Sequence, residues 1–253
     1  MLLEAVGLVK SFKGLLAIKQ VNVAIHQGEI LSIIGPNGAG KTTFFNLLTG
    51  IIPSDAGQVF FRGEEITRLA PYDIAAKGII RTFQTTKIFS QVPVLQSIMM
   101  GRHLKTKCGL FASVFRTKQM REEERVTEQK ALEIIEFVGM SAAQGSLCKN
   151  LPYGEQRKLE IAIALAAEPD LILLDEPSIG MNPEETIRIM SLIKKVRDQG
   201  TTVALVEHDM NVVMSISDRI VVFDFGEKIA EGTPAEIREN RKVIEVYLGE
   251  EFS

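Results

Sequence analysis

The chain has 253 residues, of which 45% are hydrophobic and 24% are charged, and these ordinary proportions exclude a disordered, collagen-like or disulfide-scaffold protein. The length is sufficient for one or two domains with a sizeable core. The 29 basic and 32 acidic residues give a net charge of -3, so we expect no nucleic-acid partner.

No membrane span or secretory signal is predicted. The longest charge-free stretch, residues 88–101, has 14 residues, whereas a spanning helix needs about 20 apolar residues. The amino terminus lacks a basic segment and carries Glu4, which is not typical of a signal peptide. Cys108 and Cys148 lack the spacing of metal ligands, which favours reduced thiols. We therefore expect a soluble cytoplasmic chain, or one that docks on a membrane protein.

Short apolar segments alternate with helical patterns along the chain. Segments of the kind expected for strands occupy residues 21–25, 29–34, 171–174, 202–206 and 220–223. Helices are predicted between them, among them residues 183–198, which Asn182 precedes and which begin with Pro183. Strands that alternate with helices predict a mainly parallel sheet covered on both faces.

The middle of the chain shows helical patterns and no clear strand. Within residues 118–138, Ala131, Ile134, Ile135 and Val138 fall on one face of a predicted helix. We therefore expect a single α/β domain with an inserted α-helical subdomain. The expected bounds are about 1–90 and 157–233 for the core, about 91–156 for the helical subdomain and about 234–253 for a short helical tail.

Residues 35–42 fit the phosphate-loop pattern G-x-x-x-x-G-K-[ST], the Walker A motif, between a predicted strand and a predicted helix. Glycines let the backbone curl round a phosphate, and the helix N-terminus adds positive potential. Lys41 is expected to reach the β- and γ-phosphates, and the Thr42 hydroxyl to ligate Mg²⁺. The alternative is a glycine-rich turn with a surface lysine. The predicted nucleotide-binding residues here are Gly35, Pro36, Asn37, Gly38, Ala39, Gly40, Lys41, Thr42 and Thr43.

The apolar segment 171–174 leads into two carboxylates, Asp175 and Glu176, which is the Walker B arrangement. Asp175 is expected to hold the Mg²⁺ shell and Glu176 to polarise an attacking water. The alternative is an acidic turn after a strand. Because two adjacent carboxylates are hard to ionise together, a nearby cation such as Mg²⁺ fits this pattern.

Together these motifs resemble the ATP-binding cassette family, and the resemblance covers nearly the whole chain. It implies a P-loop NTPase with a RecA-like core, a mainly parallel sheet, an antiparallel β edge and an inserted helical subdomain, with ATP and Mg²⁺ as cofactors.

The resemblance also implies roles for three further residues. Phe12 is implied to stack on adenine, and His208 to bond the γ-phosphate. Gln84 in Arg-Thr-Phe-Gln is implied to contact the metal or water and to face the membrane partner. Taken singly, Phe12 is also interpretable as a core residue, Gln84 as a surface strand residue and His208 as a helix cap. Lys41, Gln84, Glu176 and His208 are the implied catalytic residues.

Residues 151–156, Leu-Pro-Tyr-Gly-Glu-Gln, match the family's signature motif at the start of a predicted helix. In the family two cassettes pair head to tail, so Pro152, Gly154 and Gln156 are implied to face the partner's ATP. The usual signature serine is Pro152 here and a usual arginine is Ile163, so we expect a weaker γ-phosphate contact.

The branch that this chain resembles supplies ATP hydrolysis to branched-chain amino acid importers. The resemblance rests on Arg-Thr-Phe-Gln, the basic insertion at 101–125, the Leu-Pro-Tyr-Gly signature, Gly-Met-Asn-Pro at 180–183 and the ending at 232–250. It implies two membrane permease subunits, a second cassette, an extracytoplasmic solute-binding protein and a place on the cytoplasmic face of the membrane. Residues 85–100 are implied to line the groove that receives the permease.

Other functions stay open. Urea and short-amide importers share this branch, and lipopolysaccharide or lipid exporters share the compact ending. A soluble regulator of translation or DNA repair would more typically hold two cassettes or a long coiled coil, and a partner that only binds nucleotide would not need Glu176 and His208. The transported solute and the choice between a homodimer and a heterodimer are not encoded in these motifs.

Overall fold

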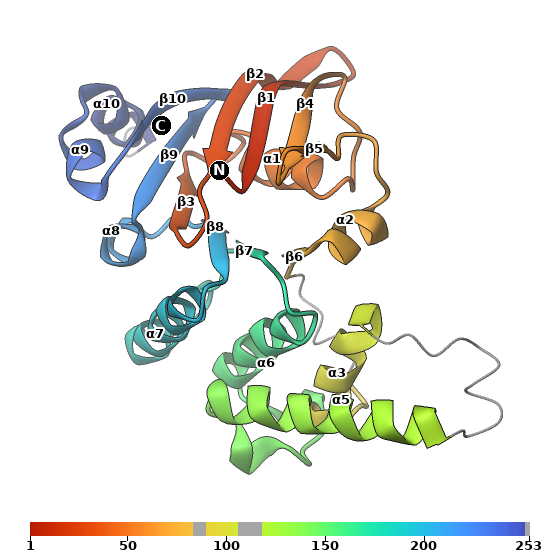
Figure 1. The fold of residues 1–253 in the computed structure, drawn as a ribbon. Coiled ribbons are helices and arrows are strands. Elements are labelled where there is room, and N and C mark those ends of the chain that lie inside the picture. Colours follow the sequence, from red (N-terminus) through yellow and green to blue (C-terminus); the bar gives the residue numbers. More distant parts are fainter. Residues whose placement is uncertain (83–89, 106–117, 251–253) are drawn as a thin grey trace. The chain divides into compact units, whose positions relative to one another are not determined.

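A computed structural model describes residues 1–82, 90–105 and 118–250. The chain divides into two compact units, each described by itself (Figure 1). The core unit comprises Met1–Arg81 and Asp170–Ser253, and the helical unit comprises Thr82–Pro169. The expected bounds of the helical subdomain, about 91–156, lie within this unit, whose carboxyl end also includes the whole helix that follows the signature motif.

The core unit contains a four-stranded antiparallel sheet. Its order is β2 (Leu15–Ile25), β1 (Leu3–Phe12), β4 (Ala56–Phe61) and β5 (Glu64–Glu65). The strand predicted at 21–25 is the second half of β2. Leu3 pairs with Ile25 on one side and Phe61 on the other, and all three side chains are buried. One face of this sheet therefore belongs to the core.

The second sheet of the core unit has six strands. Its order is β10 (Glu227–Gly232), β9 (Arg219–Asp224), β3 (Ile30–Ile34), β8 (Thr202–Val206), β7 (Leu171–Asp175) and β6 (Ile79–Arg81). The pairs from β9 to β6 are parallel, and β10 is antiparallel to β9. Every residue of β3 and β8 is buried, as expected for central parallel strands. These findings confirm the expected α/β fold.

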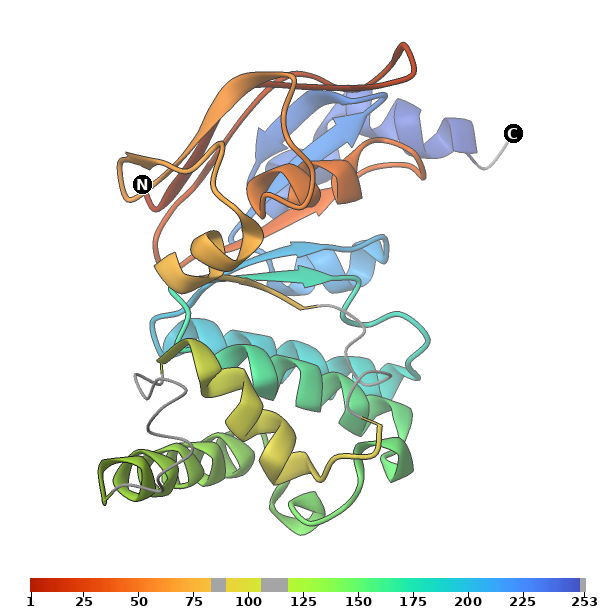
Figure 2. The same ribbon diagram turned by 90° about the vertical axis from the view of Figure 1, so that its right-hand side faces the viewer.

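Helices cover this six-stranded sheet. They are α1 (Lys41–Leu48), α2 (Pro71–Lys77), α7 (Pro183–Asp198), α8 (Met210–Ile216), α9 (Pro234–Glu239) and α10 (Arg241–Glu250). The predicted start of α7 is confirmed: Pro183 occupies its first turn, and the Asn182 side chain accepts a hydrogen bond from the Glu185 N–H over 3.0 Å. Figure 2 shows α1 between the two sheets.

The alternation of β9 divides the core into two layers. Val221 and Phe223 belong to the large cluster that α1 and the antiparallel sheet share, and the rings of Phe223 and Phe44 lie edge to face with centroids 5.2 Å apart. Ile220 and Val222 point to the opposite face and join the smaller cluster beneath α8, α9 and α10. The sheet is therefore covered on both faces.

The helical unit consists of α3 (Val94–Gly101), α5 (Lys118–Phe137), α6 (Tyr153–Ala166) and short 3₁₀ segments at Arg102–Lys105, Ser141–Ala143 and Cys148–Asn150. Of the predicted apolar face, Ala131, Ile135 and Val138 are buried and Ile134 is half-buried. Gly101 approaches α6 closely, because a Cβ there would lie 2.5 Å from the Ile163 carbonyl oxygen. The helices α3, α5 and α6 pack against one another.

The structure also bears on the expectations about membrane spans and cysteines. Among the described residues, no helix is both long and apolar enough to cross a membrane. Cys148 is a buried free cysteine whose Sγ lies 3.2 Å from Ser97 Oγ. Cys108 lies outside the described residues.

Candidate functional site

The register of three parallel strands brings the predicted motifs of the core unit to one edge of the sheet. Ile33 of β3 pairs with Val206 of β8, and Val206 pairs with Asp175 of β7. The phosphate loop begins at Gly35, directly after β3, and therefore lies beside the segments that follow β8 and β7 (Figure 1). Ligands of open α/β sheets bind at this carboxyl edge.

Two glycines of the loop are required by close backbone contacts. Gly35 has φ 146°, and a Cβ there would lie 2.0 Å from the Phe223 carbonyl oxygen. Gly40 has φ 103°, and its Cβ would lie 2.6 Å from the Ala17 carbonyl oxygen. Gly38 is exposed and has φ 81°, and apart from its two chain neighbours no described residue has an atom within 4 Å of its Cβ position. The loop is thus anchored at its ends and open in its middle.

The helix that follows the loop presents the predicted lysine and threonines. Lys41 is the first residue of α1; its side chain is buried, and Nζ donates to the carbonyl oxygens of Gly35 and Pro36 over 2.5 and 2.9 Å. Thr42 is exposed and Thr43 is half-buried. The residue at the N-cap of α1 is Gly40, which has no side chain to cap the helix, and no acidic residue lies in its first turn. Its N-terminal dipole and Nζ therefore supply a positive end next to the loop.

Asp175 ends β7 and is held by an arginine that was not predicted as a site residue. Arg81, the last residue of β6, donates from Nη2 to Asp175 Oδ2 over 2.6 Å and from Nη1 to Asn46 Oδ1 over 2.5 Å. The Arg81 side chain is 5% exposed and that of Asp175 is 29% exposed. The carboxylate is thus fixed on one side and partly open on the other.

Glu176 and His208 follow neighbouring strands and face each other. His208 Nδ1 lies 3.9 Å from Glu176 Oε1, and both side chains are at least one-third exposed. Glu176 has φ 45°, an unusual value for a residue with a side chain, and its N–H donates to the Val206 carbonyl over 2.9 Å. The alternative role of His208 as a helix cap is wrong, because the Asp209 side chain caps α8.

Glu207 is the second residue that sequence reasoning missed. Although it is fully buried, its carboxylate accepts hydrogen bonds from the Ser178 N–H, the Ser178 hydroxyl and the His208 N–H, at 2.9, 2.6 and 3.2 Å. A buried carboxylate needs such donors. The available signal was its place directly after a buried strand, next to His208.

Phe12 is the last residue of β1 and is 46% exposed. It pairs with Leu15 across the turn that joins β1 to β2, and Lys10 Nζ lies 5.6 Å from its ring centroid. The ring is therefore no core residue, and it presents a face to solvent. Its predicted stacking on adenine stays a prediction.

The signature residues belong to the helical unit. Pro152 precedes α6, Gly154 is buried in its first turn, and Gln156 Nε2 donates to the Leu151 carbonyl over 2.8 Å. Pro152, at the N-cap, makes no side-chain hydrogen bond to this helix start. Burial alone would lower the pKa of the Arg157 guanidinium, but the hydrogen bond and charge of Glu160, 2.8 Å away, raise it. The raised pKa keeps the Arg157 guanidinium charged inside the helical unit.

The helix α6 buries residues on more than one of its faces. Leu159, Ala162 and Ala166 are buried, and Ile163 is half-buried. Ile161 and Ala164, on other faces, are buried as well. Gln84 lies outside the described residues, as does the segment 85–89 of the predicted permease groove, so their roles stay predictions.

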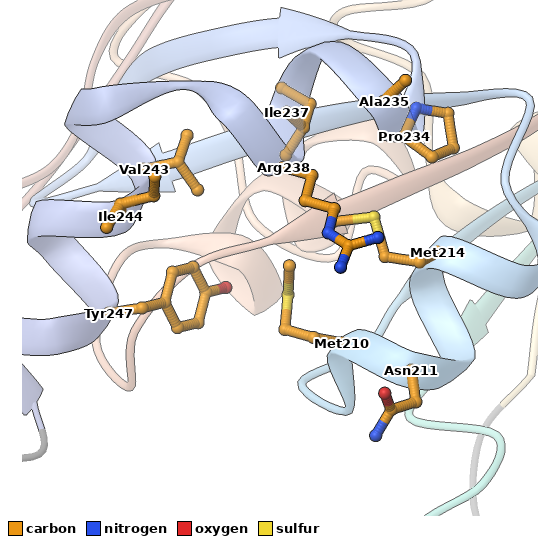
Figure 3. A pocket seen from close by; sticks show the side chains of 10 residues that line it. All are labelled: Met210, Asn211, Met214, Pro234, Ala235, Ile237, Arg238, Val243, Ile244 and Tyr247. Carbon is orange, nitrogen blue, oxygen red and sulfur yellow. The ribbon is translucent and has the colours of Figure 1, made fainter.

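A hollow elsewhere in the core unit lies between α8, α9 and α10 (Figure 3). The side chains that face it include Met210, Met214, Ile237, Arg238, Val243 and Tyr247. Among the described residues, none of those predicted for the nucleotide site lines it. The hollow is therefore separate from the predicted nucleotide site.

The residues at the sheet edge fit a magnesium–nucleotide. Gly38 leaves space above the loop, and α1 offers uncapped N–H groups, as an oligophosphate requires. Thr42 and Asp175 offer the oxygen ligands that Mg²⁺ prefers. In the described part of the chain, no group of three or more His, Cys, Asp or Glu side chains is arranged to hold a metal. Mg²⁺ at nucleotide sites does not need one, because phosphates complete its shell.

Comparison with known proteins decides the family. The model of the ABC transporter family matches residues 18–179. The chain belongs to this family. A second model, of the branched-chain amino acid ATP-binding cassette transporter, matches residues 227–253. As a family member with an intact cassette fold, the chain is an ATPase.

Individual relatives match over nearly the full length. The high-affinity branched-chain amino acid transport ATP-binding protein BraF of Pseudomonas aeruginosa is 42% identical over 98% of both chains. Its counterpart LivG of Escherichia coli K12 is 41% identical, also over 98% of both chains. The solved ADP conformation of an ATP-binding cassette of an ABC transporter matches with a TM-score of 0.86 at 31% identity, covering 98% of each chain.

Proposed function

We propose that this chain is the ATP-hydrolysing subunit of a membrane importer for branched-chain or related hydrophobic amino acids. The observation that carries the ATPase part is the edge where the phosphate loop, Asp175, Glu176 and His208 follow three neighbouring strands. The solute class is supported by the similarity to BraF and LivG and by the match of residues 227–253 to the branched-chain cassette model.

Each residue has a role that its position supports. Backbone N–H groups of the loop and Lys41 Nζ bind the phosphates, and Lys41 exchanges its two loop carbonyls for them. Thr42 and Asp175 would hold Mg²⁺, which when bound would neutralise charge on the transferred phosphoryl group. Glu176 orients and deprotonates the attacking water. His208, whose Nδ1 lies 3.9 Å from Glu176 Oε1, donates to the γ-phosphate. Gln84, which lies outside the described residues, would contact the metal or a water and face the permease.

A second cassette completes the site. Pro152, Gly154 and Gln156 would face the γ-phosphate bound by the partner cassette. Pro152 has no hydroxyl and no N–H, so the Gly154 N–H and the uncapped start of α6 carry this contact. ATP would then hold the two cassettes together, and hydrolysis would release them. The partner is a sister cassette or a second copy of this chain.

The remaining partners follow from transport. Two permease subunits would bind the cassettes on the cytoplasmic face of the membrane, and an extracytoplasmic protein would deliver the solute. The described helices do not span a membrane, so the permeases must supply the path. Solute specificity would reside in the permeases and the binding protein.

The test is uptake of labelled leucine by cells that lack this chain. Reintroducing the parent chain should restore uptake, whereas Glu176→Gln, produced at the same level, should not. Unchanged uptake after deletion would reject leucine as the cargo. Labelled urea and export of lipopolysaccharide are then measured in the same strains, because a defect there would favour the alternative functions.

A further inference from the structure

Arg81 lies where three elements of the nucleotide site meet. Its side chain is only 5% exposed. One end of the guanidinium donates to Asp175 Oδ2 over 2.6 Å and the other donates to Asn46 Oδ1 over 2.5 Å. Its central carbon lies 5.7 Å from the ring centroid of the fully buried Phe45. The guanidinium plane is therefore fixed on three sides.

The contacts of Arg81 connect the two sources of metal ligands. Asp175 ends β7, which pairs with β6, and Arg81 is the last residue of β6. Phe45 and Asn46 lie on α1, one turn after Lys41 and Thr42. Arg81 thus ties the strand that carries the carboxylate to the helix that carries the predicted threonine ligand.

The ion pair leaves part of the carboxylate open. Arg81 reaches only Oδ2, and Oδ1 of Asp175 accepts no hydrogen bond within the part of the chain that is described. A bidentate pair would have engaged both oxygens. One oxygen is therefore held while the other stays available at the sheet edge.

We propose that Arg81 is a positioning residue that orients Asp175 toward Mg²⁺ and fixes it relative to Thr42. This inference rests on the proposed function, because it assumes that Asp175 and Thr42 hold the metal of Mg-ATP. Groups that orient a metal ligand raise metal affinity by fixing the ligand before the metal arrives. Arg81 also lies three residues before Gln84, so the same anchor precedes the segment expected to contact the permease.

The test uses the full-length chain and a fluorescent ATP analogue, whose binding is measured in EDTA and across a Mg²⁺ titration. Arg81→Met should raise the Mg²⁺ concentration for half-maximal effect by about tenfold or more, with binding in EDTA changed less than about twofold. Arg81→Lys should also be impaired, because an ammonium keeps the charge but cannot span Asp175 and Asn46 in one plane.

Two controls separate positioning from general damage. Arg219→Met removes a partly buried arginine that donates to Glu29 over 2.6 Å, away from the site, and should leave the Mg²⁺ dependence unchanged. In the Asp175→Asn background, Arg81→Met should have little further effect, because the two residues act on one interaction. Should Arg81→Met fail to fold, Arg81→Lys carries the test.

The outcomes are distinct. An unchanged or lower Mg²⁺ requirement in folded Arg81→Met would overturn the inference, and equal losses in EDTA and Mg²⁺ would indicate a merely structural role and overturn it as well. If analogue binding by the parent chain does not depend on Mg²⁺, and Asp175→Asn does not change that binding, the proposed function would instead be contradicted.

Discussion

Ser178 and Glu207 follow neighbouring parallel strands and are joined by two hydrogen bonds. Glu207 Oε1 accepts from the Ser178 N–H over 2.9 Å and from its hydroxyl over 2.6 Å, while Oε2 accepts from the His208 N–H over 3.2 Å. Since Glu207 is fully buried, these donors replace the water that the carboxylate loses. One carboxylate thus holds the segment after Glu176 and the backbone of His208.

Replacing Glu207 by glutamine should therefore cost stability and hydrolysis. An amide can still accept from Ser178, but its NH₂ group would face the His208 N–H, which leaves a buried donor unsatisfied. We expect the free energy of unfolding in urea to fall by about 1–3 kcal/mol. Glu239→Gln, at an exposed position, is the control. Equal unfolding free energies for parent and Glu207→Gln would contradict this account.

Replacing Lys41 by alanine should abolish nucleotide use. Its Nζ is the only side-chain cation of the Walker A motif itself, and removing a preorganised donor costs about 10²–10³ in rate. ATP hydrolysis in the assembled transporter should fall at least that far. Lys130→Ala, which breaks an exposed pair with Glu133, should hydrolyse at the parental rate. Parental hydrolysis by Lys41→Ala would reject the site.

Two glycines of the loop should respond differently to alanine. At Gly35 the new Cβ would overlap the Phe223 carbonyl oxygen, and both overpacking and the positive φ cost about 1–3 kcal/mol each. At Gly38 only the positive φ opposes the side chain, because nothing lies within 4 Å. Thermal unfolding should therefore show a larger loss for Gly35→Ala than for Gly38→Ala. The reverse order would show that the loop is arranged differently.

The Glu231 carboxylate should contribute a pH-dependent stability. Burial alone would raise its pKa, but the Lys228 and Arg219 side chains bind the charged form and lower the pKa below the usual value of 4.5. A depressed folded pKa gives stability that is present above about pH 4.5 and is lost as the pH falls through the folded value. The advantage of the parent over Glu231→Gln in urea unfolding should thus be largest near neutral pH. An advantage that grows on acidification would contradict the sign.

Much of this site was predictable because its elements are local. The loop glycines, Lys41 and the strand before them form a contiguous pattern, and Asn182 with Pro183 predicts the start of α7 from adjacent residues. Asp175 and Glu176 follow a short apolar segment that must end a buried strand. Such signals depend on residues within one turn or one strand of each other.

The missed residues depend on register between distant segments. Arg81 and Asp175 are 94 positions apart in the sequence and meet only because β6 pairs with β7. No local pattern encodes that pairing. Glu207 is buried because β8 is central, which its sequence alone does not fix. The helix-cap alternative for His208 failed for a local reason, since Asp209 is the better N-cap.

The most direct test of the account compares the parent with Glu176→Gln in the assembled transporter, measuring bound ATP analogue and ATP hydrolysis on the same samples. Because glutamine keeps the shape but cannot take a proton, binding should stay within about twofold and hydrolysis should fall at least about 100-fold. The variant should also accumulate closed cassette pairs when Mg-ATP is present. Hydrolysis at the parental rate by Glu176→Gln would contradict the central claim.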